Sequence, residues 1–94
     1  MAVGSMVMSY AAEFLGTFLL VLSIFASGGN WLVIGATLAV VVLLIGAVSG
    51  GHVNPAVSLS ALIHGLIDMN KFVGYVVVQL AGDAAAVYTY KALA

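Results

Sequence analysis

The stretch AVSGGHVNPAVSLSALIHG, from Ala47 to Gly65, lies between two apolar runs and contains the only proline of the chain. Gly50, Gly51 and the pair Asn54 and Pro55 are residue types that end or begin helices. A loop of this composition on a soluble protein would normally also carry charges, but this one has no Asp, Glu, Lys or Arg. The fold therefore depends on whether this loop lies at a water-exposed surface or within a membrane.

The composition indicates a membrane protein. Of the 94 residues, 65% are hydrophobic and 5% are charged, whereas about 25% of the residues of a globular protein are charged. No Asp, Glu, Lys or Arg occurs from Phe14 through Ile67, and this run is much longer than the about 20 residues that cross a bilayer once. We therefore expect a single domain, residues 1–94, that crosses the cell membrane more than once.

The rarity of charges and the missing residue types exclude several classes of function. The formal net charge is −1 and there is no arginine, so neither a nucleic-acid footprint nor a polybasic patch is expected. Without cysteine there are no disulfides, thiolate metal sites or cysteine nucleophiles. His52 and His64 have no metal-ligating neighbours in the sequence pattern. We expect no enzymatic site, no cofactor and no metal.

Three segments are long and apolar enough to cross the membrane. The first covers about residues 9–26 and ends at SGGN, whose glycines and asparagine stop a helix. The second covers about residues 32–48. The third, about residues 72–90, lies between Lys71 and Lys91, whose ammonium groups can reach the two interfaces. Because MAVGSMVMSY lacks the basic region of a signal peptide, we expect the first segment to be retained.

The remaining segment, residues 53–64, is too short to cross the membrane at about 1.5 Å per residue. Asn54 is a favourable N-cap, and Pro55 suits the first helical position because its missing N–H needs no partner there. The carbonyls of the extended residues before it would cost several kcal/mol each in lipid, unless they are buried in protein or line a water-filled cavity. We therefore predict an all-α membrane protein with three transmembrane helices and a re-entrant loop and half-helix over residues 50–64.

The same residues carry a family resemblance. SGGHVNPAVS resembles the first signature loop of the aquaporins and glycerol facilitators, and AAEFLGTFLLV and VVVQLAG resemble the first and third helices of that family. The family fold has two inverted repeats, each with three spans and one half-helix, and this chain resembles one repeat. The resemblance implies a pore for water or a small neutral solute, completed by a second copy or a separate second-half chain, in tetrameric assemblies.

The resemblance also assigns pore roles. The Asn54 side-chain amide would donate to a passing water or hydroxyl oxygen, and the backbone carbonyls before it would accept hydrogen bonds. The motif residues would be Asn54, Pro55 and Ala56, and the carbonyls would be those of Gly50, Gly51, His52 and Val53.

The selectivity constriction implied by the resemblance draws on both repeats. In this chain its members would be Ile34, Val42, Gly51 and Val57. Because the chain has no arginine, this constriction would be wider and more apolar than that of a strict water channel. Glycerol and similar small neutral solutes are therefore credible substrates.

Glu13 leaves other classes of function open, because an ionisable side chain at membrane depth is a functional-site hypothesis. The resemblance implies that Glu13 accepts hydrogen bonds from backbone N–H groups near His52 and that Gln79 braces the same loop. A proton-coupled exporter similar to the small multidrug transporters would instead need an exposed Glu13 and a fourth span. A non-conducting fragment or interaction subunit is the third alternative. Asp83 departs from the family pattern, which usually has an apolar residue there.

Overall fold

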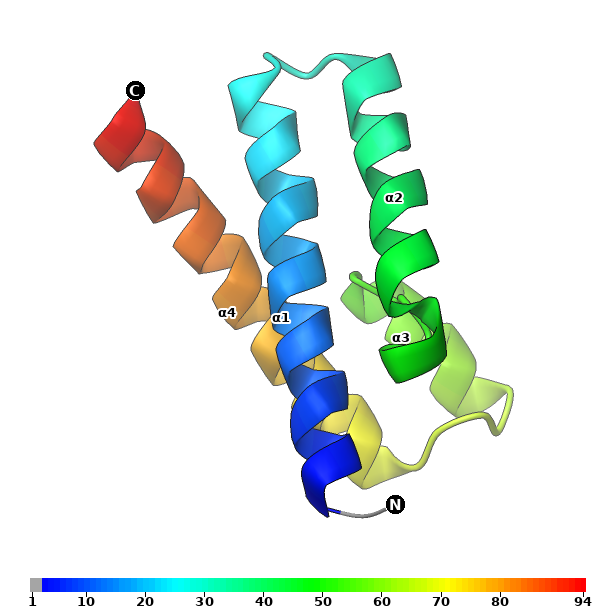
Figure 1. Ribbon diagram of the computed structural model, residues 1–94. Helices are drawn as coiled ribbons and strands as arrows, with labels where there is room; N and C mark the ends of the chain where they lie inside the picture. Colours follow the sequence, from blue (N-terminus) through cyan, green and yellow to red (C-terminus); the bar gives the residue numbers. More distant parts are fainter. Residues whose placement is uncertain (1–2) are drawn as a thin grey trace.

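The computed structural model describes residues 3–94, which form four α-helices and the loops between them. The long helices are α1 (Val3–Ala26), α2 (Trp31–Ser49) and α4 (Met69–Leu93), and α3 (Pro55–Ile63) has nine residues. In Figure 1, α1 lies between α2 and α4, and α4 crosses it at an angle. α1 packs against both of these helices, and α3 packs against α4.

The surface of the bundle is suited to lipid. By length and composition, each of the three long helices can cross a membrane. Large apolar side chains point outward, as in α2, where Leu43 is 80% and Leu44 is 67% exposed. Lipid tails solvate such side chains as well as a protein interior would, whereas water would not. The expected all-α membrane fold is confirmed.

Two helices extend beyond the apolar segments that the sequence delimits. α1 already includes Val3, and α4 begins at Met69, so that Lys71 lies in its first turn instead of before it. Asp68 explains the early start of α4, because its side chain caps the helix by accepting a hydrogen bond from the Lys71 N–H at 2.8 Å. Hydropathy marks the part of a helix that lipid covers, whereas the helix itself continues to its caps.

A glycine sets the distance between α1 and α4. A Cβ atom on Gly82 would lie 2.5 Å from the carbonyl oxygen of Phe14. Only a residue without a side chain allows the two backbones to come this close, as is common where membrane helices cross.

The buried face of α1 is polar. Ser9, Glu13 and Thr17 are spaced by four residues and therefore share one face of the helix, and each is at most 4% exposed. Gln79 of α4 is also fully buried. The interior of this bundle thus contains polar groups that need hydrogen-bonding partners.

α3 is a half-helix. Its nine residues span about 13 Å at about 1.5 Å per residue, which is less than half of the about 30 Å of hydrocarbon in a bilayer. In Figure 1 the chain leaves the lower end of α2, turns back into the bundle, and descends again as α3 toward the same end. The connection between α2 and α3 therefore lies within the depth of the long helices.

Candidate functional site

The re-entrant loop, residues 50–53, reverses the chain at the end of α2. Gly50 has a φ of 93° and caps α2 by donating its N–H to the Gly46 carbonyl at 2.9 Å. Gly51 has a φ of 64°, so both residues occupy the left-handed region that favours glycine. A Cβ atom on Gly50 would also lie 3.1 Å from Nε2 of His52. The two glycines therefore allow the turn and leave room for the imidazole.

Val53 holds a strained backbone conformation. Its φ of 46° is the one positive value at a non-glycine residue among residues 3–94, and such a conformation costs about 1–2 kcal/mol. The side chain is 4% exposed, and it packs where a Cβ atom on Gly16 would come within 2.7 Å of it. Strain of this kind persists only where the surroundings impose it. Here, buried packing and a hydrogen bond to Glu13 impose it.

Glu13 is the centre of the hydrogen-bond network that holds the loop. Its side chain is fully buried. Oε1 accepts from the Val53 N–H at 2.7 Å and from Nε2 of Gln79 at 2.9 Å. Oε2 accepts from the His52 N–H at 3.0 Å and from the Ser49 hydroxyl at 2.6 Å. Four donors thus satisfy the carboxyl group, which is what a buried acidic side chain requires.

The N–H groups of the loop point into the bundle, and its carbonyls point away. The N–H groups of Gly51, His52 and Val53 all donate to buried side-chain oxygens, two of them on Glu13. The described residues contain no cis peptide bond, and in a trans peptide the C=O is directed opposite to the N–H. The carbonyls of residues 50–52 therefore face away from Glu13. Within residues 3–94, no donor reaches the carbonyls of residues 50–53.

Asn54 places a donor beside these acceptors. It is exposed and is the N-cap of α3, with Oδ1 accepting from the Ala56 N–H at 2.8 Å. Pro55 is the first residue of the helix, as the sequence predicts. The Asn54 amide NH₂ has no hydrogen-bond partner within the described part of the chain. It lies at the partially positive N-terminus of α3.

A second layer of side chains fixes the loop from α3 and α4. The Ser58 hydroxyl lies 2.9 Å from Nε2 of Gln79 and 2.9 Å from Nδ1 of His52. The Ser58 hydroxyl accepts from Gln79 and can either donate to Nδ1 of His52 or accept from it, according to the histidine tautomer. The Tyr75 ring lies 5.1 Å from the His52 ring, and its hydroxyl donates to the Ser49 carbonyl at 2.6 Å.

Gln79 is connected to the loop through other side chains. It donates to Glu13 and Ser58, and both of these side chains hydrogen-bond to residues of the loop. The side chain of His52 is half-buried and hydrogen-bonded to Ser58, and its backbone carbonyl faces away from Glu13.

The structure brings together only part of the expected constriction. A Cβ atom on Gly51 would lie 3.4 Å from Cα of Val42, so these residues are in contact. Ile34 precedes Val42 by eight residues in α2, about 12 Å along the helix axis at about 1.5 Å per residue. Val57, in the first turn of α3, is 42% exposed. One chain therefore does not form the complete ring, and the constriction stays a prediction for an assembly of two halves.

Sequence reasoning missed three members of the network, namely Ser49, Ser58 and Tyr75. Each is at most 5% exposed and hydrogen-bonded. A signal was present, because serine hydroxyls in apolar membrane helices commonly hydrogen-bond across to a neighbouring helix. Two other polar residues stay outside the network: His64 is exposed at the end of α3, and Asp83 is half-buried with no hydrogen bond among residues 3–94.

Comparison with known families gives these features a context. Residues 28–94 match the family described as "Major intrinsic protein". The chain belongs to the major intrinsic protein family. The matching residues include α2, the re-entrant loop, α3 and α4, and so contain the whole site except the residues of α1.

Individual relatives agree with this assignment. Glycerol uptake facilitator protein-like 6 of Lactiplantibacillus plantarum is 38% identical over 85 residues, which cover 82% of this chain and 39% of that protein. Aquaglyceroporin AqpS of Rhizobium meliloti is 37% identical over 89 residues, covering 79% and 38%. Aquaporin-5 of Sus scrofa is 36% identical over 85 residues, covering 79% and 32%.

The matched region covers 32–39% of the length of these three relatives. Members of the major intrinsic protein family are membrane channels and not enzymes. Together with the three apolar helices, membership of this family makes the chain an integral, multi-pass membrane protein.

Proposed function

We propose that this chain forms one half of a membrane channel for water and small neutral solutes such as glycerol. The observation that carries the proposal is the row of three outward carbonyls, residues 50–52, beside the unpartnered amide of Asn54. A water molecule or a hydroxyl group can accept from the amide and donate to the carbonyls in turn. Such a row replaces bulk hydration during passage through a narrow pore.

The same carbonyls support the presence of a second half of the channel. Unpaired carbonyls exposed to lipid would cost several kcal/mol each, so this face requires protein or water beside it. A second copy, or a separate second-half chain, placed against this face would enclose a water-filled path. The N-terminus of its half-helix would meet that of α3, and the two partially positive ends would oppose cations and protons. Tetramers of such complete pores follow from the family resemblance.

The solute class follows from what lines the path. Val42 and Val57 are apolar and contribute no donor, and the chain has no arginine. A constriction of this kind admits a small polyol more readily than one narrowed by a long cationic side chain. The names of two of the relatives, a glycerol uptake facilitator and an aquaglyceroporin, support the same solute class.

The buried position of Glu13 disfavours the transporter alternative. A proton carrier must exchange protons with water, whereas Glu13 is fully buried and its two oxygens already accept four hydrogen bonds. We assign Glu13 to holding the loop, and Gln79 to orienting Glu13 and Ser58.

Flux in proteoliposomes tests the proposal. With equal pH on both sides, liposomes that contain the folded chain should be permeable to water and glycerol above the level of empty liposomes in stopped-flow light scattering. Asn54→Ser is the matched variant, because serine retains the capping oxygen but removes the amide donor, and we expect it to lower both permeabilities. Flux that requires a proton gradient would contradict the channel, and no flux from folded protein would contradict completion by a second copy.

A further inference from the structure

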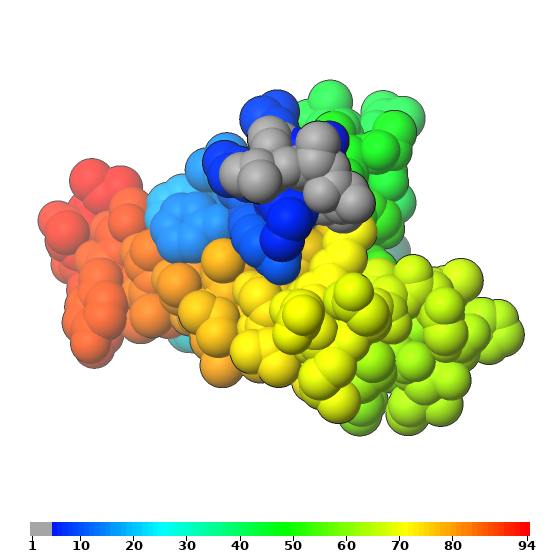
Figure 2. Space-filling view, turned by 90° about the horizontal axis from the view of Figure 1, so that it is seen from below, coloured from blue at the N-terminus to red at the C-terminus, as the bar shows by residue number. Residues whose placement is uncertain are grey.

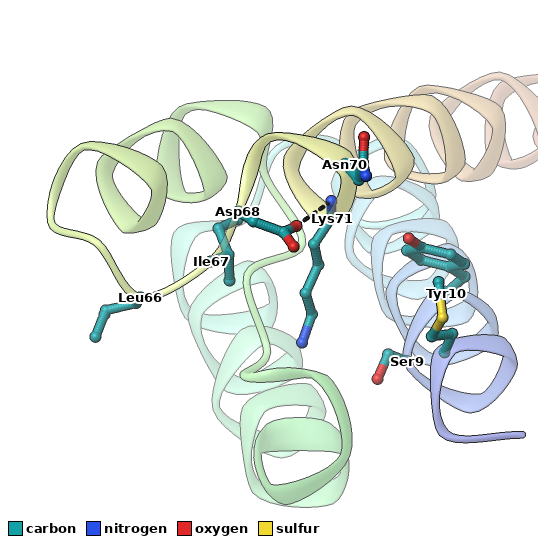
Figure 3. Close-up of a pocket in the computed structure, with 8 residues that line it drawn as sticks. Ser9, Tyr10, Leu66, Ile67, Asp68, Asn70 and Lys71 are labelled. Atoms are coloured by element: carbon teal, nitrogen blue, oxygen red, sulfur yellow. Dashed lines mark hydrogen bonds between the residues drawn. The ribbon is translucent and has the colours of Figure 1, made fainter. Parts of the chain in front are cut away.

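A second site lies at the end of the bundle where α1 and α4 begin. A pocket of about 330 Å³ lies between the first turns of α1, the loop after α3 and the first turn of α4. Its polar lining consists of Ser9, Tyr10, Asp68, Asn70 and Lys71, which Figure 3 shows from three different segments of the chain. The size is within the about 300–1,000 Å³ that small-molecule sites occupy. This pocket does not include the re-entrant loop.

Lys71 brings to this pocket a positive charge that has an aromatic contact but no paired anion among residues 3–94. Its ammonium group lies 5.5 Å from the ring centroid of Tyr75 and forms no hydrogen bond or ion pair among residues 3–94. In Figure 3 the side chain extends away from Asp68 toward the side of α1 that carries Ser9. The residue is only half-exposed. A partly buried cation without an anion is unfavourable, so the pocket favours a ligand with a negative group at this position.

Asp68 supplies the opposite charge at a different point of the same pocket. One of its oxygens caps α4 by accepting from the Lys71 N–H, and the other has no hydrogen-bond partner in the described chain. The charges of the lining therefore cancel. Sites for polyanionic head groups combine several basic residues, and this pocket has one cation and one carboxylate. The balance favours a ligand that carries one positive and one negative group.

The position of the pocket indicates a lipid. Lys71 lies in the first turn of a membrane-spanning helix, where the head groups of the bilayer lie. Figure 2 views the molecule from this end and shows the start of α4 beside the first turns of α1. Met6 and Leu66, which also line the pocket, are 37% and 72% exposed and can contact acyl chains.

We propose that this pocket binds the head group of phosphatidylethanolamine, with the phosphate at the Lys71 ammonium and the primary ammonium at Asp68. A primary ammonium has three donors for the free Asp68 oxygen and for neighbouring polar groups such as Asn70. A quaternary choline ammonium has none, and a phosphatidylglycerol head group offers the carboxylate hydroxyl groups but no positive charge.

Lipid retention measured by native mass spectrometry tests this assignment. The detergent-purified chain is incubated with equal amounts of phosphatidylethanolamine, phosphatidylglycerol and phosphatidylcholine. We expect phosphatidylethanolamine to be retained preferentially, and Lys71→Gln to lower its retention roughly tenfold, as for the loss of one charge-assisted hydrogen bond. Lys91→Gln, at the other end of α4, is the matched control and should leave retention unchanged.

A second variant tests the role of the carboxylate. Asp68→Asn retains the helix cap, because asparagine caps as well as aspartate, but removes the negative charge. Its lipid preference should move from phosphatidylethanolamine toward phosphatidylglycerol. Soluble phosphoethanolamine should compete only at much higher concentration than the lipid, and equal potency would contradict a lipid site.

The outcomes are independent of conduction, because the measurement records binding alone. Equal retention of the three lipids by the unaltered chain would overturn the proposal. An effect of Lys71→Gln no larger than that of Lys91→Gln would also overturn it.

Discussion

Among single residues, Glu13 determines how the loop can be polar at membrane depth. It accepts hydrogen bonds from two inward N–H groups of the loop. These bonds fix the direction of the carbonyls on the other side of the same peptides. A buried carboxyl group serves this purpose because its two oxygens accept several hydrogen bonds at once. Glu13 thus determines the direction of the outward carbonyls from the opposite side of the loop.

The effect of replacing Glu13 should depend on whether the new side chain keeps an oxygen that can accept hydrogen bonds. Glu13→Leu removes the acceptor of four donors, and only the Ser49 hydroxyl hydrogen has another, the Ile45 carbonyl; at about 1–3 kcal/mol for each unsatisfied buried group, the free energy of unfolding should fall by several kcal/mol. Glu13→Gln keeps one oxygen and should lose roughly half as much, with measurable solute flux. Unfolding in mixed detergent micelles and flux in liposomes measure the two effects. Equal loss of flux in both variants, with a steep pH dependence in the unaltered chain, would instead support a proton carrier.

The residues of the site were predictable to different degrees. The capping preferences of Asn54 and Pro55 alone predict the start of α3. Glu13 and Gln79 are 66 positions apart, and only the family resemblance joins them. The roles of Ser49, Ser58 and Tyr75 were not predicted. They depend on which faces of the helices pack together, and a nearly uniform apolar sequence does not specify this packing. The positive φ of Val53 has no sequence signal, since valine disfavours it.

Among the helices, the contact between α1 and α4 brings the members of the hydrogen-bond network together. Glu13 and Gln79 lie on these two helices and can meet only if the backbones approach closely. Gly82 permits this approach, so its effect reaches the loop through the position of Gln79, one turn earlier on the same helix.

Gly82→Ala should therefore be destabilising although alanine is the better helix former. The added Cβ atom meets the Phe14 carbonyl oxygen at 2.5 Å, and forced separation of packed elements typically costs about 1–3 kcal/mol. Gly35→Ala is the matched control in α2, because nothing lies within 4 Å of its Cβ position, and it should be neutral or stabilising by about 0.5–1 kcal/mol. Unfolding of both variants in mixed micelles gives the comparison, and equal stabilities would show that the close approach is unimportant.

The helices themselves were largely predictable. Apolar length gave the three spans, and the shortness of the segment after Asn54 gave the half-helix. Their ends were less predictable, because caps such as Asp68 extend a helix past its apolar part. The crossing of α4 over α1 was not predictable, since the sequence does not indicate which of its 11 glycines contact α1, as Gly74 and Gly82 do.

For the whole molecule, the balance of positive charge bears on assembly. Lys71 and Lys91 are the chain's only basic residues apart from its histidines, and they lie near opposite ends of α4. Membrane proteins are normally oriented by an excess of basic residues on one side, but here each side has one lysine. A chain without a fixed orientation can pair with an inverted copy, which reproduces the inverted repeats of the family fold.

Reporter fusions at each end of this chain test its orientation in cells. A dual orientation should give signal from both sides of the membrane for the same fusion, in comparable amounts. Adding one lysine beside Lys71 should shift the population toward the orientation with that end in the cytoplasm. One fixed orientation of the unaltered chain would exclude the inverted pair of copies and leave a separate second-half chain as the partner.

In the proposed channel, the face formed by the outward carbonyls and the first turn of α3 lines a water-filled path. Because the chain has no cysteine, a single introduced thiol reports its own surroundings. Val57→Cys lies on this face, and Leu43→Cys, at a position 80% exposed on α2, should face lipid. We predict that a charged, membrane-impermeant thiol reagent labels Val57→Cys in liposomes and blocks glycerol flux, and that it does not label Leu43→Cys. Labelling of both or neither, or labelling of Val57→Cys without loss of flux, would show that this face does not line the path of the solute.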